Sequence, residues 1–166
     1  MTPNNFKIRE IKPTENAQIA KVIRAILIEY GVPKVGTAYA DKMLDSLSDV
    51  YTIENAIYLV VEKHGVIYGG AGIKQLDNYQ GKICELQKMY FLPEIRGIGL
   101  GNKMLDICLQ KAISFGFEKC YLETLPYMEE ARKLYKKAGF KNLNAPMGNT
   151  GHFSCNLWML KNLQCK

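Results

Sequence analysis

The stretch Arg96-Gly97-Ile98-Gly99-Leu100-Gly101 lies between an apolar run at 84–91, which favours a strand, and a helix pattern that starts at Leu100. Glycines allow the backbone to approach a ligand, and the free N–H groups and dipole of a helix N-terminus attract anions. The guanidinium of Arg96 adds a forked donor that suits phosphate oxygens. The turn therefore predicts a ligand that carries a pyrophosphate.

Two common phosphate-binding motifs do not fit this turn. A P-loop needs Lys and then Ser or Thr after its last glycine, but Gly101 is followed by Asn102-Lys103-Met104. A dinucleotide-binding fold places its Gly-x-Gly-x-x-Gly motif after the first strand, whereas several strand candidates precede this turn. The simpler alternative is a turn that only starts a helix. The neighbouring sequence is needed to distinguish this alternative from a phosphate-binding turn.

Composition limits the class of protein. The chain has 166 residues, of which 48% are hydrophobic, so we expect a single domain over residues 1–166 with a proper core. The net charge of +6 comes from scattered Lys and Arg residues, with no basic run longer than Lys136-Lys137, which disfavours nucleic acid as a partner. No apolar run is long enough to span a bilayer, and the polar N-terminus lacks the layout of a signal peptide. We therefore expect no membrane partner.

The cysteines indicate the compartment. They stand at positions 84, 108, 120, 155 and 165, an odd number without a Cys-x-x-Cys pair. This arrangement argues against a disulfide framework and against a zinc knuckle. The first three fall within apolar strand or helix patterns, where a free cysteine is usually a packing residue. We therefore expect a cytoplasmic protein.

The hydrophobic pattern predicts an alternating order of strands and helices. We expect strands at 6–11, 57–62, 66–75, 83–91, 119–124 and 153–160. Helices are predicted from 13 to about 30, from 100 to about 115 and over 128–138, with a possible short helix at 41–47. Lys63-His64-Gly65 suits a hairpin turn, so His64 is interpreted as a turn residue without a functional role. This order predicts a mixed sheet with helices packed on it.

Two motifs in the second half of the chain resemble those of the GCN5-related N-acetyltransferases, the GNAT family. The run Glu-Leu-Gln-Lys-Met-Tyr-Phe-Leu-Pro-Glu-Ile-Arg-Gly-Ile-Gly-Leu-Gly at 85–101 is similar to that family's core motif. The run Ala-Arg-Lys-Leu-Tyr-Lys-Lys-Ala-Gly-Phe at 131–140 resembles the motif that follows it. Both lie in the family's order and spacing, with a helix and a strand between them. The resemblance implies a three-layer α/β fold with a mixed, mostly antiparallel sheet of about seven strands and helices on both faces.

The resemblance also implies acetyl-CoA as donor and the primary amine of a small molecule as acceptor. The glycine-rich turn would hold the pyrophosphate through backbone N–H groups. In the family, the fourth strand bulges and parts from the fifth, and the pantetheine arm fills the gap, where one backbone N–H also polarises the thioester carbonyl. No metal and no covalent intermediate is required. The implied contacts to acetyl-CoA are Met89, Tyr90, Phe91, Arg96, Gly97, Ile98, Gly99, Leu100, Gly101, Asn102 and Ala131.

Two side chains are implied to move protons. Glu85 stands where many relatives carry a catalytic glutamate, which would deprotonate the attacking ammonium directly or through a water. The alternative is a polar strand residue without a role. Tyr135 stands where the family places a tyrosine near the thioester sulfur, and it would protonate the leaving thiolate. The alternative is an amphipathic tyrosine on the core-facing side of its helix.

One position departs from the family pattern. Many relatives carry Asn three residues before Ala131, where it bonds the pantetheine arm, but this chain has Met128. Thr124 is a candidate to replace that contact. Cys155 begins an apolar run without an assignable base, so a catalytic thiol is not expected there.

The acceptor is the least determined part of this interpretation. Within Gly148-Asn149-Thr150-Gly151-His152-Phe153, His152 could bind an acceptor carboxylate or relay a proton, but we interpret it as an exposed loop histidine. Asp41, Asp45 and Asp49 could attract a cationic amine, yet their spacing of four is more typical of a solvated helix face. Two other functions stay open, acetylation of a protein N-terminus or lysine, and CoA binding without catalysis. A homodimer is also open, because relatives often dimerise.

Overall fold

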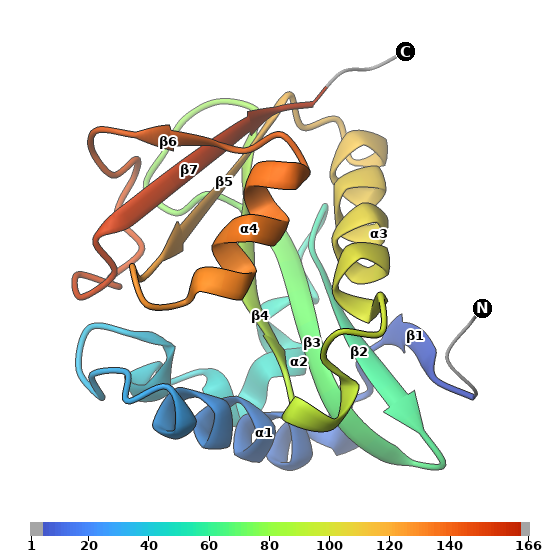
Figure 1. Cartoon of the computed structure of the whole chain (residues 1–166). Helices are drawn as coiled ribbons and strands as arrows, with labels where there is room; N and C mark the ends of the chain where they lie inside the picture. Colours follow the sequence, from blue (N-terminus) through green and yellow to red (C-terminus); the bar gives the residue numbers. More distant parts are fainter. Residues whose placement is uncertain (1–4, 164–166) are drawn as a thin grey trace.

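The computed structural model describes residues 5–163. Within this range, seven strands form one sheet in the order β1-β2-β3-β4-β5-β7-β6 (Figure 1). All neighbouring strands are antiparallel except β4 and β5, which are parallel. The mixed, mostly antiparallel sheet expected from the sequence is confirmed. The strands are β1 Lys7–Glu10, β2 Ile57–Lys63, β3 Val66–Gln75, β4 Ile83–Phe91, β5 Lys119–Thr124, β6 Lys141–Leu143 and β7 Leu157–Asn162.

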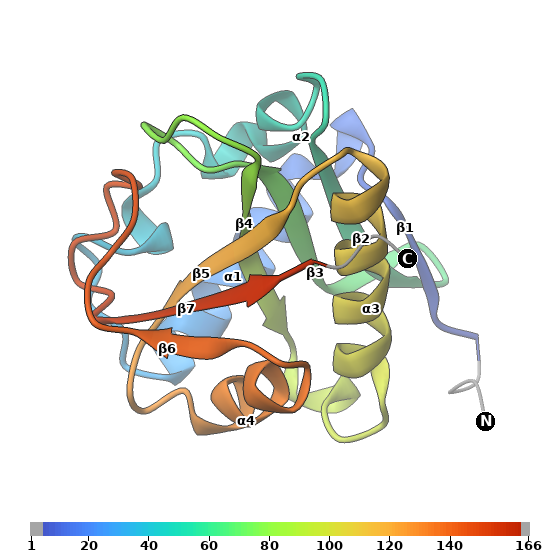
Figure 2. The same ribbon diagram turned by 90° about the horizontal axis from the view of Figure 1, so that it is seen from above.

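Helices cover both faces of this sheet, so the fold has three layers (Figure 2). The helices are α1 Asn16–Glu29, α2 Leu47–Val50, α3 Leu100–Ser114 and α4 Glu129–Lys137. One core lies under α3 and α4 and includes Met104, Cys108 and Tyr135, while α1 packs into a second core on the other face through Ile19, Ile23 and Ile26. Both cores follow from the helical spacing of these apolar residues.

Most predicted element boundaries are confirmed within a residue or two, including the turn between β2 and β3. There, His64 and Gly65 both have positive φ values of 53° and 79°. This conformation is that of a type I′ hairpin, whose twist matches the flanking strands.

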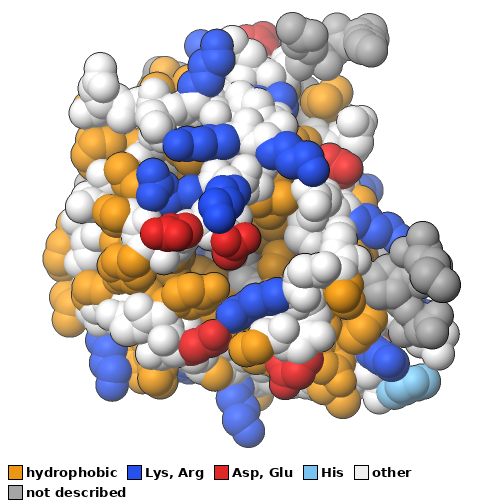
Figure 3. All heavy atoms as spheres, viewed as in Figure 1, with side chains coloured by type: hydrophobic (Ala, Val, Ile, Leu, Met, Phe, Trp, Pro, Cys, Tyr) orange, Lys and Arg blue, Asp and Glu red, His pale blue; other side chains and the backbone are white. Residues whose placement is uncertain are grey.

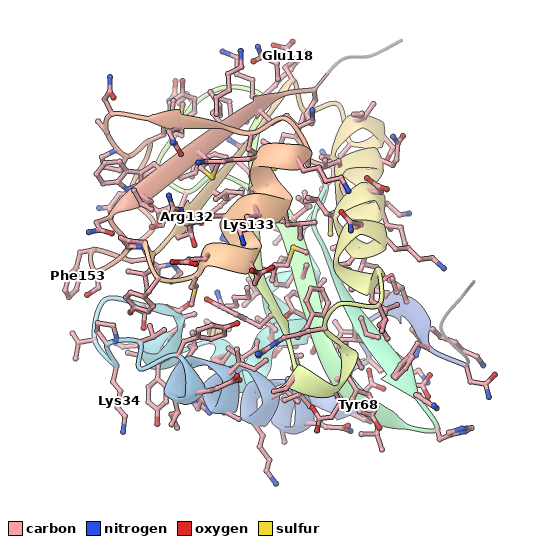
Figure 4. The ribbon with its side chains drawn as sticks, in the orientation of Figure 1. Lys34, Tyr68, Glu118, Arg132, Lys133 and Phe153 are labelled. Carbon is pink, nitrogen blue, oxygen red and sulfur yellow. The ribbon has the colours of Figure 1, made fainter. Side chains whose placement is uncertain are left out.

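Three predicted or omitted elements differ in the structure. The possible helix at 41–47 is wrong, because that segment holds a 3₁₀ turn at Leu44–Ser46 and α2 starts only at Leu47. The last strand begins at Leu157 rather than 153, because residues 152–155 form a turn closed by a hydrogen bond from Cys155 N to His152 O (3.0 Å). Phe153 in that turn is 76% exposed and points outward (Figure 4). Strand β6 was missed because Lys141-Asn142-Leu143 carries no alternating pattern.

No helix among residues 5–163 is both long and apolar enough to cross a membrane. The four cysteines in that range, Cys84, Cys108, Cys120 and Cys155, are free, and the first three are buried as expected. Cys165 lies outside the described residues.

Candidate active site

Strands β4 and β5 pair over only three residues and then part. The parallel register joins Ile83 to Lys119 and ends at Glu85 opposite Tyr121. Beyond that point, β4 continues to Phe91 and β5 to Thr124 without pairing with each other. The backbone edges that face this gap are therefore free to bond an extended ligand, as a sheet edge does.

A cleft of about 460 Å³ occupies this gap, and we call it the large cleft. Its walls come from α1, β4, the glycine-rich turn, β5 and α4. Nine of the eleven residues that the sequence assigned to acetyl-CoA line it: Met89, Tyr90, Phe91, Arg96, Gly97, Gly99, Gly101, Asn102 and Ala131. The side chains of the other two do not line it, because Ile98 is 44% exposed and Leu100 is buried in the core. These two can contribute only backbone groups.

The glycine-rich turn opens one end of the large cleft onto the N-terminus of α3, a helix of 15 residues. Gly97 and Gly99 adopt positive φ values of 74° and 85°, which other residues rarely adopt. The hydrogen bond from Lys103 N to Gly99 O (3.1 Å) closes the first turn. The N–H groups of Leu100, Gly101 and Asn102 precede it and have no partner within the helix, so the turn offers the donor set that an anion requires.

The side chain of Arg96 is used differently from the sequence expectation. Its guanidinium donates to both carboxylate oxygens of Glu29 (2.8 and 2.9 Å), and its Nε donates to the carbonyl of Phe91 (2.8 Å). The ring of Tyr30 lies beneath it, 5.2 Å from the guanidinium carbon to the ring centroid. Helix α1 ends beside the turn, so the carboxylate of its last residue, Glu29, binds the guanidinium that the sequence predicted to bind phosphate. Arg96 therefore ties α1 to the glycine-rich turn.

Tyr135 of α4 reaches the large cleft from the core side. Its side chain is 7% exposed and makes an edge contact with Phe140, with ring centroids 5.9 Å apart. Among residues 5–163, every fully buried side-chain N or O atom has a hydrogen-bond partner. The hydroxyl of Tyr135 has no partner there, so it is not fully buried. Because Tyr135 lines the large cleft, its hydroxyl opens into that cleft. Burial raises the pKa of Tyr135, with smaller contributions from Cys120 and Cys108. The hydroxyl therefore keeps its proton at neutral pH.

Met128 and Thr124 meet at the wall of the large cleft. The hydroxyl of Thr124 lies 3.8 Å from the sulfur of Met128 and donates to it. A thioether is a weak acceptor, so this hydroxyl can turn toward a stronger acceptor. The role of Thr124 as a replacement for the missing Asn stays a prediction.

A β-bulge in β4 lies beside the gap. Gly70 pairs with Tyr90 and Gly72 pairs with Gln87, so Lys88 and Met89 together face one residue of β3. Lys88 has a φ of 49°, a left-handed conformation that is strained for a residue with a long side chain. The hydroxyl of Tyr58 donates to the carbonyl of Lys88 (2.9 Å) and holds this conformation. Bulges of this kind re-aim side chains next to active sites.

Glu85 is buried beside the point where β4 and β5 part. It is 2% exposed, and the amide of Gln87 donates to its Oε2 (2.9 Å). Gln87 in turn accepts from the hydroxyl of Tyr51 (2.6 Å). Burial raises the pKa of Glu85 to about 7, Gln87 opposes this rise, and the carboxylate of Glu123 adds to it. A carboxyl group with such a pKa exchanges protons near neutral pH.

The residues around Glu85 form a charged cluster that the sequence did not predict. One polar atom each from Glu85, Glu123 and His152 lies within 4.8 Å of the other two. Glu123 accepts a hydrogen bond from Tyr121 (2.8 Å) and another from Thr150. This cluster brings β4, β5 and the loop before β7 together.

His152 and Asp41 are corrections to the sequence interpretation. The His152 side chain is 14% exposed, and its Nε2 lies 2.9 Å from Asp41. Asp41 also accepts from Lys88 (2.8 Å), so it is no solvated helix residue, whereas Asp45 is exposed and pairs with Arg24. Burial raises the pKa of Asp41, but the hydrogen bond from His152 and the charge of Lys88 outweigh burial and lower the pKa below its usual value. Asp41 is therefore ionised at neutral pH.

A second cavity has a volume of about 240 Å³, and we call it the small cavity. Lys88 of the bulge belongs to the lining of both cavities. The small cavity is lined by Asp41, Lys42, Met43, Leu47, Val50, Lys74, Asp77, Gln87, Lys88, Thr150 and His152. Glu85 lines neither cavity, but its neighbour Gln87 lines the small one and Glu123 lines the large one.

The surroundings of Cys155 raise the pKa of its thiol. Burial raises the pKa of its thiol to about 12, and the carboxylates of Glu123, Glu85 and Asp41 add to the rise. Because the thiolate is the reactive form, a raised pKa disfavours this thiol as a nucleophile at neutral pH.

Basic side chains gather over α4 on the face seen in Figure 3. Arg132 and Lys133 belong to this group (Figure 4), and Lys133 and Lys137 line the large cleft. Much of the exposed positive charge on this face therefore surrounds the cleft. A cationic rim favours an anionic ligand.

Sequence reasoning missed Gln87, Lys88 and Glu123 as members of the site, and it favoured a solvated helix face for Asp41 over a role in binding. A charged residue inside the otherwise apolar run of β5 was the available signal for Glu123. Lys88 carried no signal, because its direction depends on the bulge.

Comparison with known proteins supports an acetyltransferase fold. A sequence model described as "Acetyltransferase (GNAT) family" matches residues 22–140. YjgM, an uncharacterised N-acetyltransferase of Escherichia coli, is 42% identical over 164 residues, which is 98% of each chain. A GNAT-family acetyltransferase structure from Staphylococcus aureus superposes with a TM-score of 0.84 at 21% identity, covering 96% of this chain and 99% of that one. The structure of yncA, a putative acetyltransferase of Salmonella typhimurium with its cofactor acetyl-CoA, gives a TM-score of 0.75 at 20% identity, with 97% and 95% covered.

Proposed function

Because the chain belongs to the acetyltransferase (GNAT) family, we propose that it transfers the acetyl group of acetyl-CoA to the primary amine of a small molecule, by direct attack in a ternary complex. The observation that carries the proposal is the continuity of the large cleft. The cleft runs from the gap between β4 and β5 to the N-terminus of α3. It thus joins free strand edges, which suit an amide-containing arm, to a glycine-rich anion site, which suits a pyrophosphate.

The residues of the cleft fit acetyl-CoA. When bound, acetyl-CoA supplies an acetyl group activated as a thioester. The unpaired edge of β4 after Glu85 would bond the pantetheine amides, and a backbone N–H from Met89–Phe91 would polarise the thioester carbonyl. The yncA structure, which contains acetyl-CoA, has the same fold and supports this choice of donor.

Glu85 is proposed as the general base. An ammonium must lose a proton before it can attack a carbonyl carbon. A base works best when its pKa lies near the operating pH, and the pKa of Glu85, about 7, meets that condition. Its burial and its bond to Gln87 hold the carboxyl group in one orientation.

Tyr135 is proposed as the general acid. Its hydroxyl is protonated at neutral pH and opens into the large cleft, where it can donate a proton to the leaving thiolate. Glu85 lies on β4 and Tyr135 on α4, so the proton acceptor and the proton donor approach the reacting atoms from different elements.

The size of the small cavity favours a small acceptor over a peptide. It is about 240 Å³ and is bounded by the segments around α2 and the loop before β7. The free cysteines support work in a reducing compartment, and we propose the cytoplasm.

An acceptor screen tests the proposed function. Purified protein is mixed with acetyl-CoA and a panel of small primary amines, and free thiol is measured with time. We expect amine-dependent thiol release by at least one class of amine and an N-acetylated product by mass spectrometry. Binding of acetyl-CoA without thiol release from any amine would favour a CoA-binding module, and acetylation of peptides alone would favour a protein acetyltransferase.

A further inference from the structure

We propose that the small cavity binds the carboxylate of an α-amino-acid-like acceptor, with the acceptor's ammonium turned toward Glu85 and Glu123. This inference rests on the proposed function and names the acceptor class for that site. It starts from two nearly buried lysines in the lining of the small cavity, each of which is paired with an aspartate that also lines it.

Lys74 is the first of these lysines. On β3 it pairs directly across from Glu85 on β4, so both side chains leave the same face of the sheet. Yet its ammonium binds Asp77, 2.7 Å away, at the wall of the small cavity. Its side chain is 14% exposed while that of Asp77 is 46% exposed. The ammonium of Lys74 is thus held at the cavity, and Glu85 is left without a cationic partner from β3.

Lys88 is the second. The bulge of β4 gives it the left-handed conformation described above, and its side chain is 10% exposed. Its ammonium binds Asp41, which itself accepts from His152. A strained conformation persists only where the surroundings impose it, and such residues cluster at ligand sites. The strain here places a second ammonium at the wall of the small cavity.

The charges around the small cavity are polarised. Its wall carries Lys42, Lys74 and Lys88 against Asp41 and Asp77, an excess of one positive charge. His152 lines this cavity, and behind it one carboxyl oxygen each of Glu85 and Glu123 lies within 4.8 Å of its ring nitrogen. A zwitterion matches this arrangement, because its carboxylate can reach the lysines while its ammonium reaches the carboxyl groups. The ammonium then lies beside the proposed base.

Acceptor preference gives the first test. The proteinogenic α-amino acids are compared with their carboxamides as acceptors, with thiol release as readout. A carboxamide carries a less basic amine, so more of it is neutral and nucleophilic at pH 7, and chemistry alone favours it. We expect the opposite, with kcat/KM for the free acids higher by roughly 10- to 100-fold, the effect of losing a charged hydrogen bond.

A pair of matched variants gives the second test. Lys74→Gln removes the ammonium from the small cavity, and Lys82→Gln removes the same charge from a side chain that is 70% exposed and paired with Glu118. We expect Lys74→Gln to lower kcat/KM for the acids by roughly 10- to 100-fold and to lower it much less for the carboxamides. Lys82→Gln should change neither, and Lys74→Arg should restore part of the preference.

The outcomes separate this inference from the proposed function. Carboxamides or simple amines that are acetylated as well as the acids overturn the carboxylate site and leave the acetyltransferase intact. Equal preference in wild type and Lys74→Gln also overturns it. If no amine releases thiol, binding of an N-acetylated amino acid is measured calorimetrically. Binding to wild type that Lys74→Gln abolishes supports the site without catalysis, and absence of binding overturns the site as well.

Discussion

At the scale of single residues, the surroundings of Glu85 set the pKa of the group proposed as the base. The group that raises its pKa after burial is Glu123, a residue of the neighbouring strand that also lines the large cleft. The hydrogen bond from Gln87 limits this rise and orients the carboxyl group. Two features of the fold, burial and a carboxylate on the parallel neighbouring strand, thus raise the pKa of Glu85 to about 7, as the proposed role of base requires.

We expect Glu85→Gln to lower turnover by roughly 10²–10⁴-fold, because the variant cannot accept a proton from the acceptor. Affinity for acetyl-CoA should not change, since Glu85 does not line the large cleft. In wild type, kcat/KM should rise with pH and change slope near 7, and the variant should lose that step. Steady-state kinetics against pH measures both. Wild-type turnover in the variant would show that the base lies elsewhere.

The same substitution should stabilise the fold at high pH. The pKa of Glu85 is about 7 in the folded protein and 4.5 for an ordinary glutamate, so ionising the folded carboxyl group costs free energy as pH rises. At low pH both states are protonated and the cost vanishes. Denaturant unfolding should therefore show Glu85→Gln more stable than wild type by roughly 1–3 kcal/mol near pH 8, with the difference shrinking toward about pH 5. A difference independent of pH would contradict the raised pKa.

Two substitutions of Tyr135 distinguish its proposed role in catalysis from its role in packing. Tyr135→Phe keeps the ring against Phe140 and removes only the hydroxyl. We expect lower turnover, little change in acetyl-CoA affinity, and stability within roughly 1 kcal/mol of wild type. Tyr135→Ala should also destabilise the fold by roughly 3–5 kcal/mol, because the ring is buried. Steady-state kinetics at saturating acceptor measures the turnover of Tyr135→Phe against that of wild type. Equal turnover in Tyr135→Phe, with chemistry rate-limiting, would leave thiolate protonation to water.

At the scale of elements, the proposal assigns the pyrophosphate to the N-terminus of α3 together with the turn before it. Gly97 and Gly99 need their positive φ, so substitution there mixes backbone strain with any effect on the ligand. Gly101 lies inside the helix, and a Cβ there would meet Leu134 at 3.5 Å, an ordinary contact. Position 101 therefore allows a test of charge alone.

We expect Gly101→Asp to fold normally and to weaken acetyl-CoA binding by roughly 10-fold or more, because its carboxylate would repel the pyrophosphate at close range. Gln110→Glu adds the same charge to an exposed position of α3 and is the matched control. Calorimetric titration with acetyl-CoA compares the two. Unchanged affinity in Gly101→Asp would place the pyrophosphate elsewhere.

At the scale of the whole molecule, the large cleft interrupts the sheet between β4 and β5. Its walls include Ile26 of α1 and Tyr30, which directly follows α1, together with residues of α4. A ligand bound there contacts both halves of the sheet, so its binding energy adds to the stability of the whole fold.

Acetyl-CoA should therefore stabilise the protein by roughly 2.7 kcal/mol at a concentration a hundred times its Kd. For a chain of this size, Tm should rise by roughly 5–10 °C. Acetyl-pantetheine, which keeps the thioester arm and lacks the pyrophosphate, should give a much smaller shift at the same concentration. Differential scanning fluorimetry measures both, and equal shifts would argue against the anion site at α3.

Much of the fold and part of the site could be predicted from the sequence. The bounds of β3, β4 and β5 and the start of α3 follow from local periodicity and from glycines at turns. Glu85 and Tyr135 could be named as candidates because they stand at fixed positions within two local motifs, and their catalytic roles stay predictions. Exceptions were β6, which is too short to show a pattern, and the residues before β7, where a turn replaced the expected strand.

The tertiary structure alone decided how the charged residues are paired. His152 and Asp41 are 111 positions apart in the chain, and Arg96 and Glu29 are 67 apart. Lys74 lies opposite Glu85 because of the β3–β4 register, and Lys88 points to Asp41 because of the bulge. Local sequence determines backbone conformation, since that depends on near neighbours. Ion pairs and pKa values depend on burial and on which distant groups the packed sheet brings within a few ångströms, so they exist only in the folded chain.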